Sequence, residues 1–370
     1  MKRLVVCCDG TWNAPDEVDD GVSVPTNVCR IAQAVALRDR HDREQHVFYD
    51  KGVGTGGALD RITGGAFGAG LAKNVRDAYR FLVDTFEPGD EVFLFGFSRG
   101  AFTARSTAGF VRNCGILRRE FVEHLDDAWA LYHSGEPSTH PRSTEAELFR
   151  RSFSTETRIR FVGVFDTVGS LGVPVADLPG AALVNRHVQF HDTDLSGQVD
   201  GAFHALAMHE RRGTFSPTLW TVPRDQPRTS DQDLEQVWFT GVHSDIGGGY
   251  ARRGLADVTL LWMMSRAERY GLDFVPGSFP WQWSDPMRQE AVWPDALQAP
   301  HDSLATFPYR FLPRFRRTPV AGTTVSSSAV DHEKNRPDAP DEFAGILGDA
   351  ERTTPVEHVL GASGDLVDRG

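Results

Sequence analysis

The stretch that decides the fold is Val92-Phe93-Leu94-Phe95-Gly96-Phe97-Ser98-Arg99-Gly100-Ala101. Residues 91–97 form an apolar run, which is typical of a strand buried on both faces of a parallel sheet, and residues 101–111 have helical spacing. Between them stands a serine with a glycine two residues to either side, where the backbone can reverse sharply. The pattern predicts a nucleophile elbow, with the Ser98 hydroxyl at the tip of a turn from strand to helix.

Three further strand-like runs end in polar residues. Residues 4–8 lead into Asp9, residues 158–165 lead into Asp166, and residues 236–242 lead into His243. Another short strand at 46–49 and helical patterns over 28–35, 71–86 and 255–270 complete an alternation of strand and helix. We therefore predict an α/β fold, an α/β-hydrolase-like three-layer sandwich whose central sheet is mostly parallel and carries helices on both faces. The polar strand ends should share one edge of that sheet, where ligands bind.

The chain order Ser98, Asp166, His243 is that of a catalytic triad on an α/β-hydrolase sheet. A serine hydroxyl becomes a good nucleophile only when an imidazole takes its proton, and a carboxylate must hold that imidazole in the right tautomer. We predict Ser98 as nucleophile, His243 as general base and Asp166 as the orienting acid. Four other histidines compete for the role of base from loops, namely His204, His209, His301 and His332.

An oxyanion hole needs two N–H donors near the nucleophile. The amide of Arg99, at the start of the helix after the elbow, is predicted to supply one. The second is predicted to come from the turn after the first strand, from Gly10 or Thr11. Other residues at the strand ends are expected to line or support the site: Asp9, Asn13, Tyr250, and Asp245, which would fix its loop by bonding into Gly247-Gly248-Gly249.

Two rival classes remain open. Asp9-Gly10-Thr11 matches the end of a phosphohydrolase signature, but the nucleophilic aspartate of that signature would fall at Cys7, which disfavours a phosphatase of that type. The carboxylates at the strand ends could hold a metal ion, although polar residues around a hydrolase site explain them equally well. We expect no metal and no cofactor. A metal-dependent phosphohydrolase and a non-catalytic binding module on the same scaffold are the alternatives.

Composition limits the partners. The 370 residues carry a formal charge of −12, which argues against general binding to nucleic acid. The short N-terminal apolar run is not a signal peptide and no apolar stretch is long enough to span a bilayer, so we expect a cytoplasmic protein, with signal-independent export left open. The expected partner is a small-molecule or lipid ester. Residues 279–283 are aromatic and residues 307–317 alternate aromatic residues with arginine, so transient contact with a membrane or phosphate head groups is left open, but an ordinary folded surface is the simpler interpretation.

Changes in composition and hydrophobic periodicity divide the chain into three parts. Residues 1–271 are predicted to form the catalytic domain, 272–330 an irregular layer packed on it, and 331–370 an acidic, partly ordered tail. The glycine-rich residues 52–70 are expected to form a loop beside the site.

Five motifs in order resemble a known family: residues 9–13, 96–101, 164–169, 210–220 and 242–250. It is the bacterial and fungal family of uncharacterised α/β-hydrolase domains that includes the type VI secretion phospholipase effectors of the first lipase-effector class. The resemblance implies an α/β-hydrolase fold, a triad at Ser98, Asp166 and His243, and ester cleavage in phospholipids. The chain departs from the secreted effectors in lacking a large appended module, and relatives carry a His-Ser-Val motif where this chain has Ser328-Ala329-Val330-Asp331-His332.

Overall fold

The computed structural model describes most of the chain. The residues that it describes are 1–10, 18–19, 21–52, 64–169, 195–222, 231–275, 278, 292, 294–305, 315, 317, 324–335 and 353–354. Several of the predictions made above concern residues outside these ranges: Thr11, Asn13, residues 53–63 and 279–283, residues 307–317 other than 315 and 317, and residues 331–370 other than 331–335 and 353–354.

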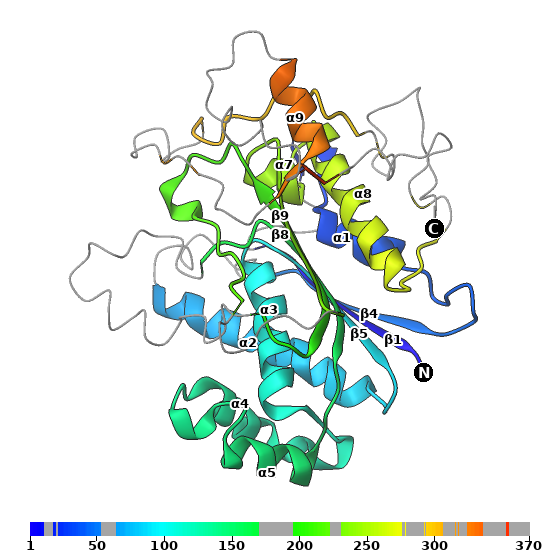
Figure 1. The fold of residues 1–370 in the computed structure, drawn as a ribbon, viewed down its shortest axis with the longest axis vertical. Coiled ribbons are helices and arrows are strands. Elements are labelled where there is room, and N and C mark those ends of the chain that lie inside the picture. Colours follow the sequence, from blue (N-terminus) through cyan, green and yellow to red (C-terminus); the bar gives the residue numbers. More distant parts are fainter. Residues whose placement is uncertain are drawn as a thin grey trace, which may run out of the picture.

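In the described part of the chain, eight parallel strands form a central sheet (Figure 1). Its spatial order is β12-β11-β10-β9-β8-β5-β1-β4. The strands are β1 (Arg3–Cys8), β4 (Gln45–Asp50), β5 (Glu91–Phe97), β8 (Ile159–Phe165), β9 (Val199–Ala207), β10 (Asp233–Phe239), β11 (Thr324–Ser326) and β12 (Thr353–Thr354). Two antiparallel pairs lie apart from it, β2 (Val18–Asp19) with β3 (Val22–Ser23) and β6 (Ile116–Leu117) with β7 (Ser154–Thr155).

Helices cover both faces of the sheet. On one face lie α2 (Gly64–Thr85) and α3 (Arg99–Cys114), with α4 (Leu125–His133) and α5 (Thr144–Phe153) packed on α3. On the other face lie α1 (Asn27–Ala34) and α8 (Gly254–Arg269) (Figure 1). Strand β1 alternates between these layers: Leu4 and Val6 join the core under α2 and α3, whereas Val5 and Cys7 join the core under α1 and α8. The predicted three-layer α/β sandwich is confirmed.

The N-terminus of α1 confirms a predicted helix start. The Thr26 hydroxyl accepts a hydrogen bond from the Cys29 amide at 3.1 Å, which satisfies a donor that has no partner within the helix. The helix then buries Val28 and Ile31 against the sheet, as their spacing requires.

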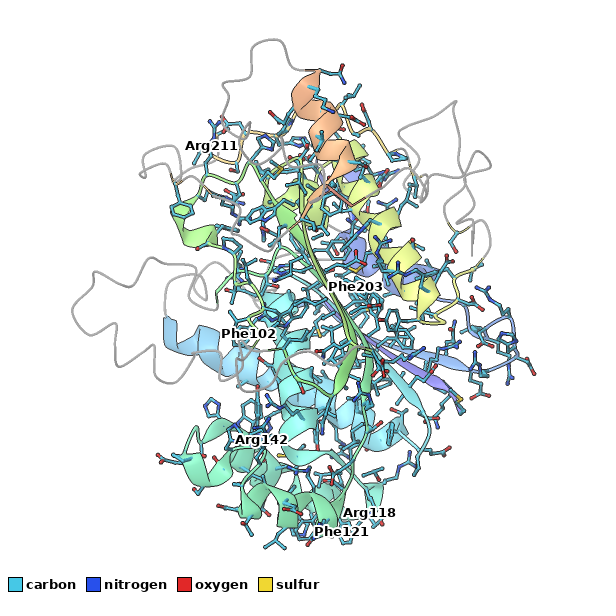
Figure 2. The ribbon with its side chains drawn as sticks, viewed as in Figure 1. Phe102, Arg118, Phe121, Arg142, Phe203 and Arg211 are labelled. Carbon is cyan, nitrogen blue, oxygen red and sulfur yellow. The ribbon has the colours of Figure 1, made fainter. Side chains whose placement is uncertain are left out.

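Strand β9 is not apparent in the sequence, yet it lies at the heart of the sheet between β8 and β10. It contains Gly201, three alanines and His204 rather than a run of β-branched residues, so its composition indicates no strand. Phe203 supplies its largest apolar side chain and packs edge-on against Trp262 of α8, with ring centroids 6.3 Å apart (Figure 2). We infer that β9 forms because of its packing between β8 and β10 and not because of its local sequence.

Two segments differ from the sequence-based expectation. Helix α2 begins at Gly64, so the predicted glycine-rich loop over residues 52–70 is wrong from Gly64 onward. Glycine lowers helix stability by only about 1 kcal/mol per residue. The helix that forms after Leu71 therefore continues towards the N-terminus through the glycine-rich residues, as far as Gly64. At the other end, α9 (Ser327–Lys334) runs across the boundary predicted after residue 330, and β11 and β12 add strands to the main sheet.

The two glycines of the elbow are required by close backbone packing. A Cβ atom on Gly100 would lie 2.1 Å from the Cys8 carbonyl oxygen, and one on Gly96 would lie 2.5 Å from the Gly100 carbonyl oxygen. Both neighbours are backbone atoms of the central sheet and the elbow, which cannot move aside. The glycines therefore let α3 begin directly against β1.

We expect Gly100→Ala to lower the free energy of unfolding by roughly 3 kcal/mol or more, because the clash is with backbone. The matched control is Gly197→Ala, whose Cβ would have no atom of the described chain within 4 Å and should cost less than about 1 kcal/mol. Urea denaturation of both variants measures the difference. Equal stabilities would show that the elbow tolerates a side chain at this position.

Candidate active site

Ser98 occupies a strained turn between β5 and α3. Its φ is 57° and its ψ is −118°, and its amide donates to the Phe165 carbonyl oxygen at 3.0 Å, which ties the elbow to the end of β8. Among the described residues other than glycine, positive φ occurs only at Asp42, Ser98 and Asp166. Strained backbone of this kind concentrates at functional sites. Two of these three residues are the predicted nucleophile and the predicted acid.

Asp166 and His243 form a buried pair. Asp166 follows β8, and His243 is the first residue of α7 (His243–Gly247), in the turn that follows β10. His243 Nδ1 lies 2.6 Å from Asp166 Oδ2. An Nδ1–H that donates to the carboxylate leaves Nε2 as the proton acceptor, which is the tautomer that a general base needs.

Aromatic rings hold the His243 imidazole next to the elbow. Its ring centroid lies 4.7 Å from that of Phe97, the residue before Ser98, and 4.8 Å from that of Phe215, which meets it edge-on. Gly247 permits this closeness, since a Cβ there would lie 2.1 Å from the Phe97 ring. The sequence analysis gave Phe97 and Phe215 no role in the site.

Glu210 anchors the backbone of the same loop. The His243 amide donates to Glu210 Oε2 at 3.2 Å, and the Ser303 hydroxyl donates to Oε1 at 2.9 Å. Burial alone would raise the pKa of Glu210, but the hydrogen bonds and charge of Arg212 outweigh it and lower the pKa to about 2. The carboxylate therefore stays ionised and continues to accept these bonds at physiological pH.

The charge states of the Asp–His pair follow from its surroundings. Burial alone would raise the pKa of Asp166, but the charge of Arg317 and the hydrogen bond from His243 outweigh it and hold that pKa well below its usual value. Burial lowers the pKa of His243 below its ordinary 6.5, against the opposing effect of Asp166. At neutral pH the pair is a carboxylate and a neutral imidazole.

This charge state predicts the acid limb of the pH profile. Because His243 must be neutral to accept a proton and its pKa lies below 6.5, kcat/KM for an ester should fall with a midpoint below pH 6.5 as one proton binds. Initial rates at low substrate concentration, with circular dichroism to verify folding, provide the measurement. A midpoint above pH 7 would contradict the assignment of His243 as the base.

The turn after β1 is built around a buried carboxyl group. Asp9 accepts hydrogen bonds from the Thr26 hydroxyl at 2.6 Å, the Tyr49 hydroxyl at 2.6 Å and the Gly10 amide at 2.7 Å. Burial outweighs these bonds and raises the pKa of Asp9 to about 6. Asp9 thus joins the end of β1 to Thr26 and Tyr49, while its role in the site stays a prediction.

The oxyanion donors stay predictions. The Arg99 amide stands at the first residue of α3, immediately after Ser98. The Gly10 amide is directed to Asp9 in this structure, so donation to an oxyanion would require it to share or change its partner. Thr11 and Asn13 lie outside the described residues.

Asp245 fixes the loop that carries His243, though by other bonds than expected. Its Oδ2 accepts from the amides of Val242 and His301, both at 3.0 Å, and its Oδ1 lies 2.5 Å from His301 Nδ1. The predicted bond into Gly247-Gly248-Gly249 is replaced by these, because His301 comes from a segment distant in sequence. Tyr250 stacks on the His301 ring with centroids 4.0 Å apart.

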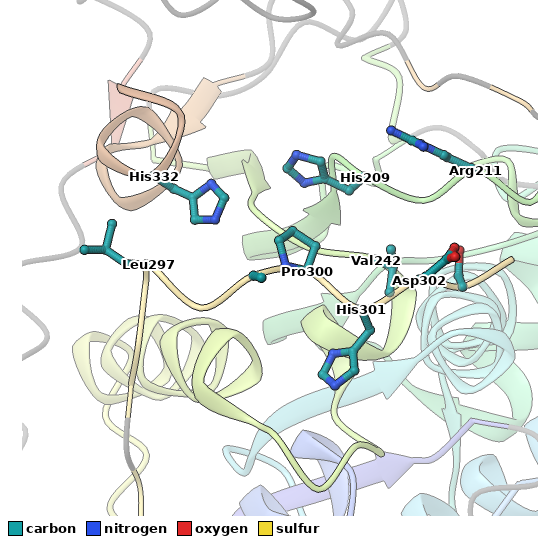
Figure 3. A pocket seen from close by; sticks show the side chains of 10 residues that line it. His209, Arg211, Val242, Leu297, Pro300, His301, Asp302 and His332 are labelled. Atoms are coloured by element: carbon teal, nitrogen blue, oxygen red, sulfur yellow. The ribbon is translucent and has the colours of Figure 1, made fainter. Parts of the chain in front are cut away.

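The competing histidines have partners elsewhere. His204 Nε2 accepts from the Thr167 amide at 3.0 Å, and burial followed by the charge of Arg105 lowers the pKa of His204 to about 3. Both His209 Nε2, at 3.2 Å, and His332 Nδ1, at 3.3 Å, face Glu333 Oε1. His209, His301 and His332 line a cavity of about 280 Å³ (Figure 3). These histidines serve structural contacts around the loop that carries His243.

Arg317 is another residue of the site that the sequence does not reveal. Its Nη1 donates to Asp166 Oδ1 at 2.6 Å and its Nη2 donates to Asp166 Oδ2 at 3.0 Å, and its side chain is fully buried. The interpretation of residues 307–317 as a surface with exposed arginines is therefore wrong at Arg317. The sequence around it has no periodicity that could single out one arginine.

In the part of the chain that the structure describes, the His, Cys, Asp and Glu side chains form no group of three or more that could hold a metal ion. The helices of the described residues include none both long and apolar enough to cross a bilayer.

Comparison with known proteins places the chain in a family. The family model described as T6SS, Phospholipase effector Tle1-like, catalytic domain matches residues 2–266. The uncharacterized protein YEL023C of Saccharomyces cerevisiae is 31% identical over 241 residues, which are 60% of this chain and 33% of the yeast protein.

Two solved structures are similar at low sequence identity. An uncharacterized protein from Pseudomonas aeruginosa is 16% identical with a TM-score of 0.44, over 79% of this chain and 49% of that one. The Tle1 effector bound to the VgrG spike of the type VI secretion system is 20% identical with a TM-score of 0.37, over 67% of this chain and 51% of that one. The chain thus spans about a third of its yeast relative and about half of each solved protein. Because the family model covers well over half of its residues, this chain belongs to the family of Tle1-like type VI secretion phospholipase effector catalytic domains.

Proposed function

We propose that this protein is a serine hydrolase that cleaves carboxylic ester bonds of phospholipids. The observation that carries the proposal is the buried Asp166–His243 hydrogen bond of 2.6 Å, formed beside a strained elbow that carries Ser98. Membership of a family of phospholipase effector domains supports a lipid as the substrate. The low pKa of Asp166 and the neutral imidazole of His243 suit their roles as orienting acid and general base.

The reaction would proceed in two steps. His243 Nε2 takes the proton of the Ser98 hydroxyl as its oxygen attacks the ester carbonyl carbon, and the resulting oxyanion is bound by the Arg99 amide. The tetrahedral intermediate collapses as His243 gives the proton to the departing alcohol, which leaves an acyl group on Ser98. Water, deprotonated by His243, then attacks the acyl carbonyl, and the fatty acid leaves as Ser98 regains its proton.

The test is hydrolysis of a panel of short-chain esters, triglycerides and phospholipids by the wild type and Ser98→Ala, with and without a chelator. We expect release of fatty acid from phospholipid by the wild type, abolished in Ser98→Ala and unchanged by the chelator. A wild type that is folded but inactive on every acyl chain length would favour a binding module. Activity that survives Ser98→Ala but not the chelator would favour a metal-dependent phosphohydrolase.

A further inference from the structure

Arg317 approaches the site from outside the segment that the family model covers. That model ends at residue 266, whereas Arg317 lies 151 residues after its partner Asp166. The side chain of Arg317 reaches the ends of β8 and β9 and is fully buried there. The C-terminal part of the chain thus supplies a charged group to the interior of the site.

The bonds of Arg317 are directed at one carboxylate and the backbone around it. Besides its two bonds to Asp166, Arg317 Nη1 donates to the Ala207 carbonyl oxygen at 3.0 Å and Nη2 donates to the Phe215 carbonyl oxygen. A guanidinium presents its N–H groups in a planar fork that matches a carboxylate. Burying such a cation is costly unless it is paired, so this geometry persists only because Asp166 is there to receive it.

Both oxygens of Asp166 are bound from several sides. Oδ1 accepts from Arg317 Nη1 and from the Ala207 amide at 3.0 Å, while Oδ2 accepts from Arg317 Nη2 and from His243 Nδ1. The carboxylate cannot rotate without breaking several of these bonds. Its plane therefore fixes the direction in which His243 Nδ1 must point.

We propose that Arg317 is a positioning residue, which locks the Asp166 carboxylate in the orientation that holds His243 for proton transfer. The inference rests on the proposed function, because it assigns Arg317 a task within that triad. It also implies that a chain cut after the family-model region lacks part of its own active site.

The charge of Arg317 adds a consequence that a purely structural arginine would not have. It offsets the negative charge of Asp166, which otherwise stabilises the imidazolium form of His243. Glu210 and Arg212 also act on the pKa of His243. His204, whose pKa of about 3 leaves it neutral, lies within the electrostatic reach of both Asp166 and Arg105. Glu210 and Arg212 pair with each other, so Arg317 is the cation that directly balances Asp166.

The experiment compares the wild type, Arg317→Met and Arg317→Lys by the rate at which a fluorophosphonate labels Ser98 across a range of pH, together with thermal unfolding. For Arg317→Met we expect labelling at neutral pH to slow roughly 10- to 100-fold and the acid-limb midpoint to rise by about one pH unit. Arg317→Lys retains the charge but not the fork, so it should keep the wild-type midpoint while labelling slowly.

The matched control is Arg266→Met, which removes another buried arginine from its ion pair with Glu235. It should lose stability without a shift of the midpoint. Folded Arg317 variants that react at the wild-type rate with the wild-type midpoint would overturn the inference and leave the proposed function standing. If Arg317→Met does not fold, a wild-type rate in Arg317→Lys alone overturns it. A wild type that is not labelled at Ser98 would refute the proposed function itself, and this inference with it.

Discussion

Replacing Ser98 with alanine should lower kcat/KM for ester hydrolysis by roughly 10⁴- to 10⁶-fold, the largest effect expected of any substitution in the chain. In the proposed mechanism the hydroxyl oxygen is the atom that bonds to the acyl carbon, and the adjacent residues Phe97 and Arg99 carry no hydroxyl. The fold should survive, because the φ of 57° and the hydrogen bond from the residue 98 amide to the Phe165 carbonyl oxygen involve only the backbone. Steady-state kinetics and thermal unfolding of the same preparation measure both effects.

Two further variants sharpen this test. Ser98→Gly should be just as inactive yet more stable than the wild type by up to about 1 kcal/mol, because glycine adopts a positive φ without strain. Ser106→Ala is the matched control, since Ser106 is a buried serine of α3, the helix that begins directly after Ser98, and the kcat/KM of this variant should stay close to that of the wild type. More than a tenth of the activity in Ser98→Ala would rule out Ser98 as the nucleophile.

The second large effect is expected for Asp166→Asn, which should reduce kcat/KM by roughly 10⁴-fold. An asparagine can present an N–H to His243 Nδ1, so the imidazole would be held in the wrong tautomer. The same change leaves Arg317 buried without an anion, which should lower the free energy of unfolding by roughly 3–5 kcal/mol. Loss of activity and loss of stability should therefore appear together.

A control separates the two losses. Asp257→Asn breaks another buried pair, that of Arg30 with Asp257, and should lower stability comparably while most activity remains. The double variant Asp166→Asn with Arg317→Met should regain part of the stability, since it leaves no unpaired buried cation, but none of the activity. An Asp166→Asn enzyme with near wild-type kcat/KM would contradict the role of Asp166.

Much of the fold could be predicted because local patterns agree with the tertiary structure. The apolar run of β5 with its flanking glycines, the Thr26 cap of α1 and the spacing within α8 each contain their own signal. Strand β9 could not be predicted, because its small residues become a strand only between β8 and β10. The start of α2 was likewise hidden, since its first turns are rich in glycine.

The candidate site likewise contains residues that local sequence patterns indicate and residues that only long-range packing places. Ser98, Asp166 and His243 follow strands, so chain order and the shared edge of a parallel sheet predict that they lie together. The structure joins two of them, Asp166 and His243, by a hydrogen bond. Arg317, Phe215 and the partnership of Asp245 with His301 depend on how distant segments pack, which no local pattern records. The sequence therefore indicates which polar residues follow the strands, but it does not indicate the contacts between distant segments that hold them in place.

The measurement that tests the central claim most directly is the site of covalent labelling. The folded wild type is treated with a fluorophosphonate, and the modified peptide is identified by mass spectrometry, with Ser98→Ala treated in parallel. The proposed mechanism predicts one label per chain, on Ser98, with none on the variant. Equal labelling of the two proteins, or a wild type that stays unlabelled while folded, would contradict it.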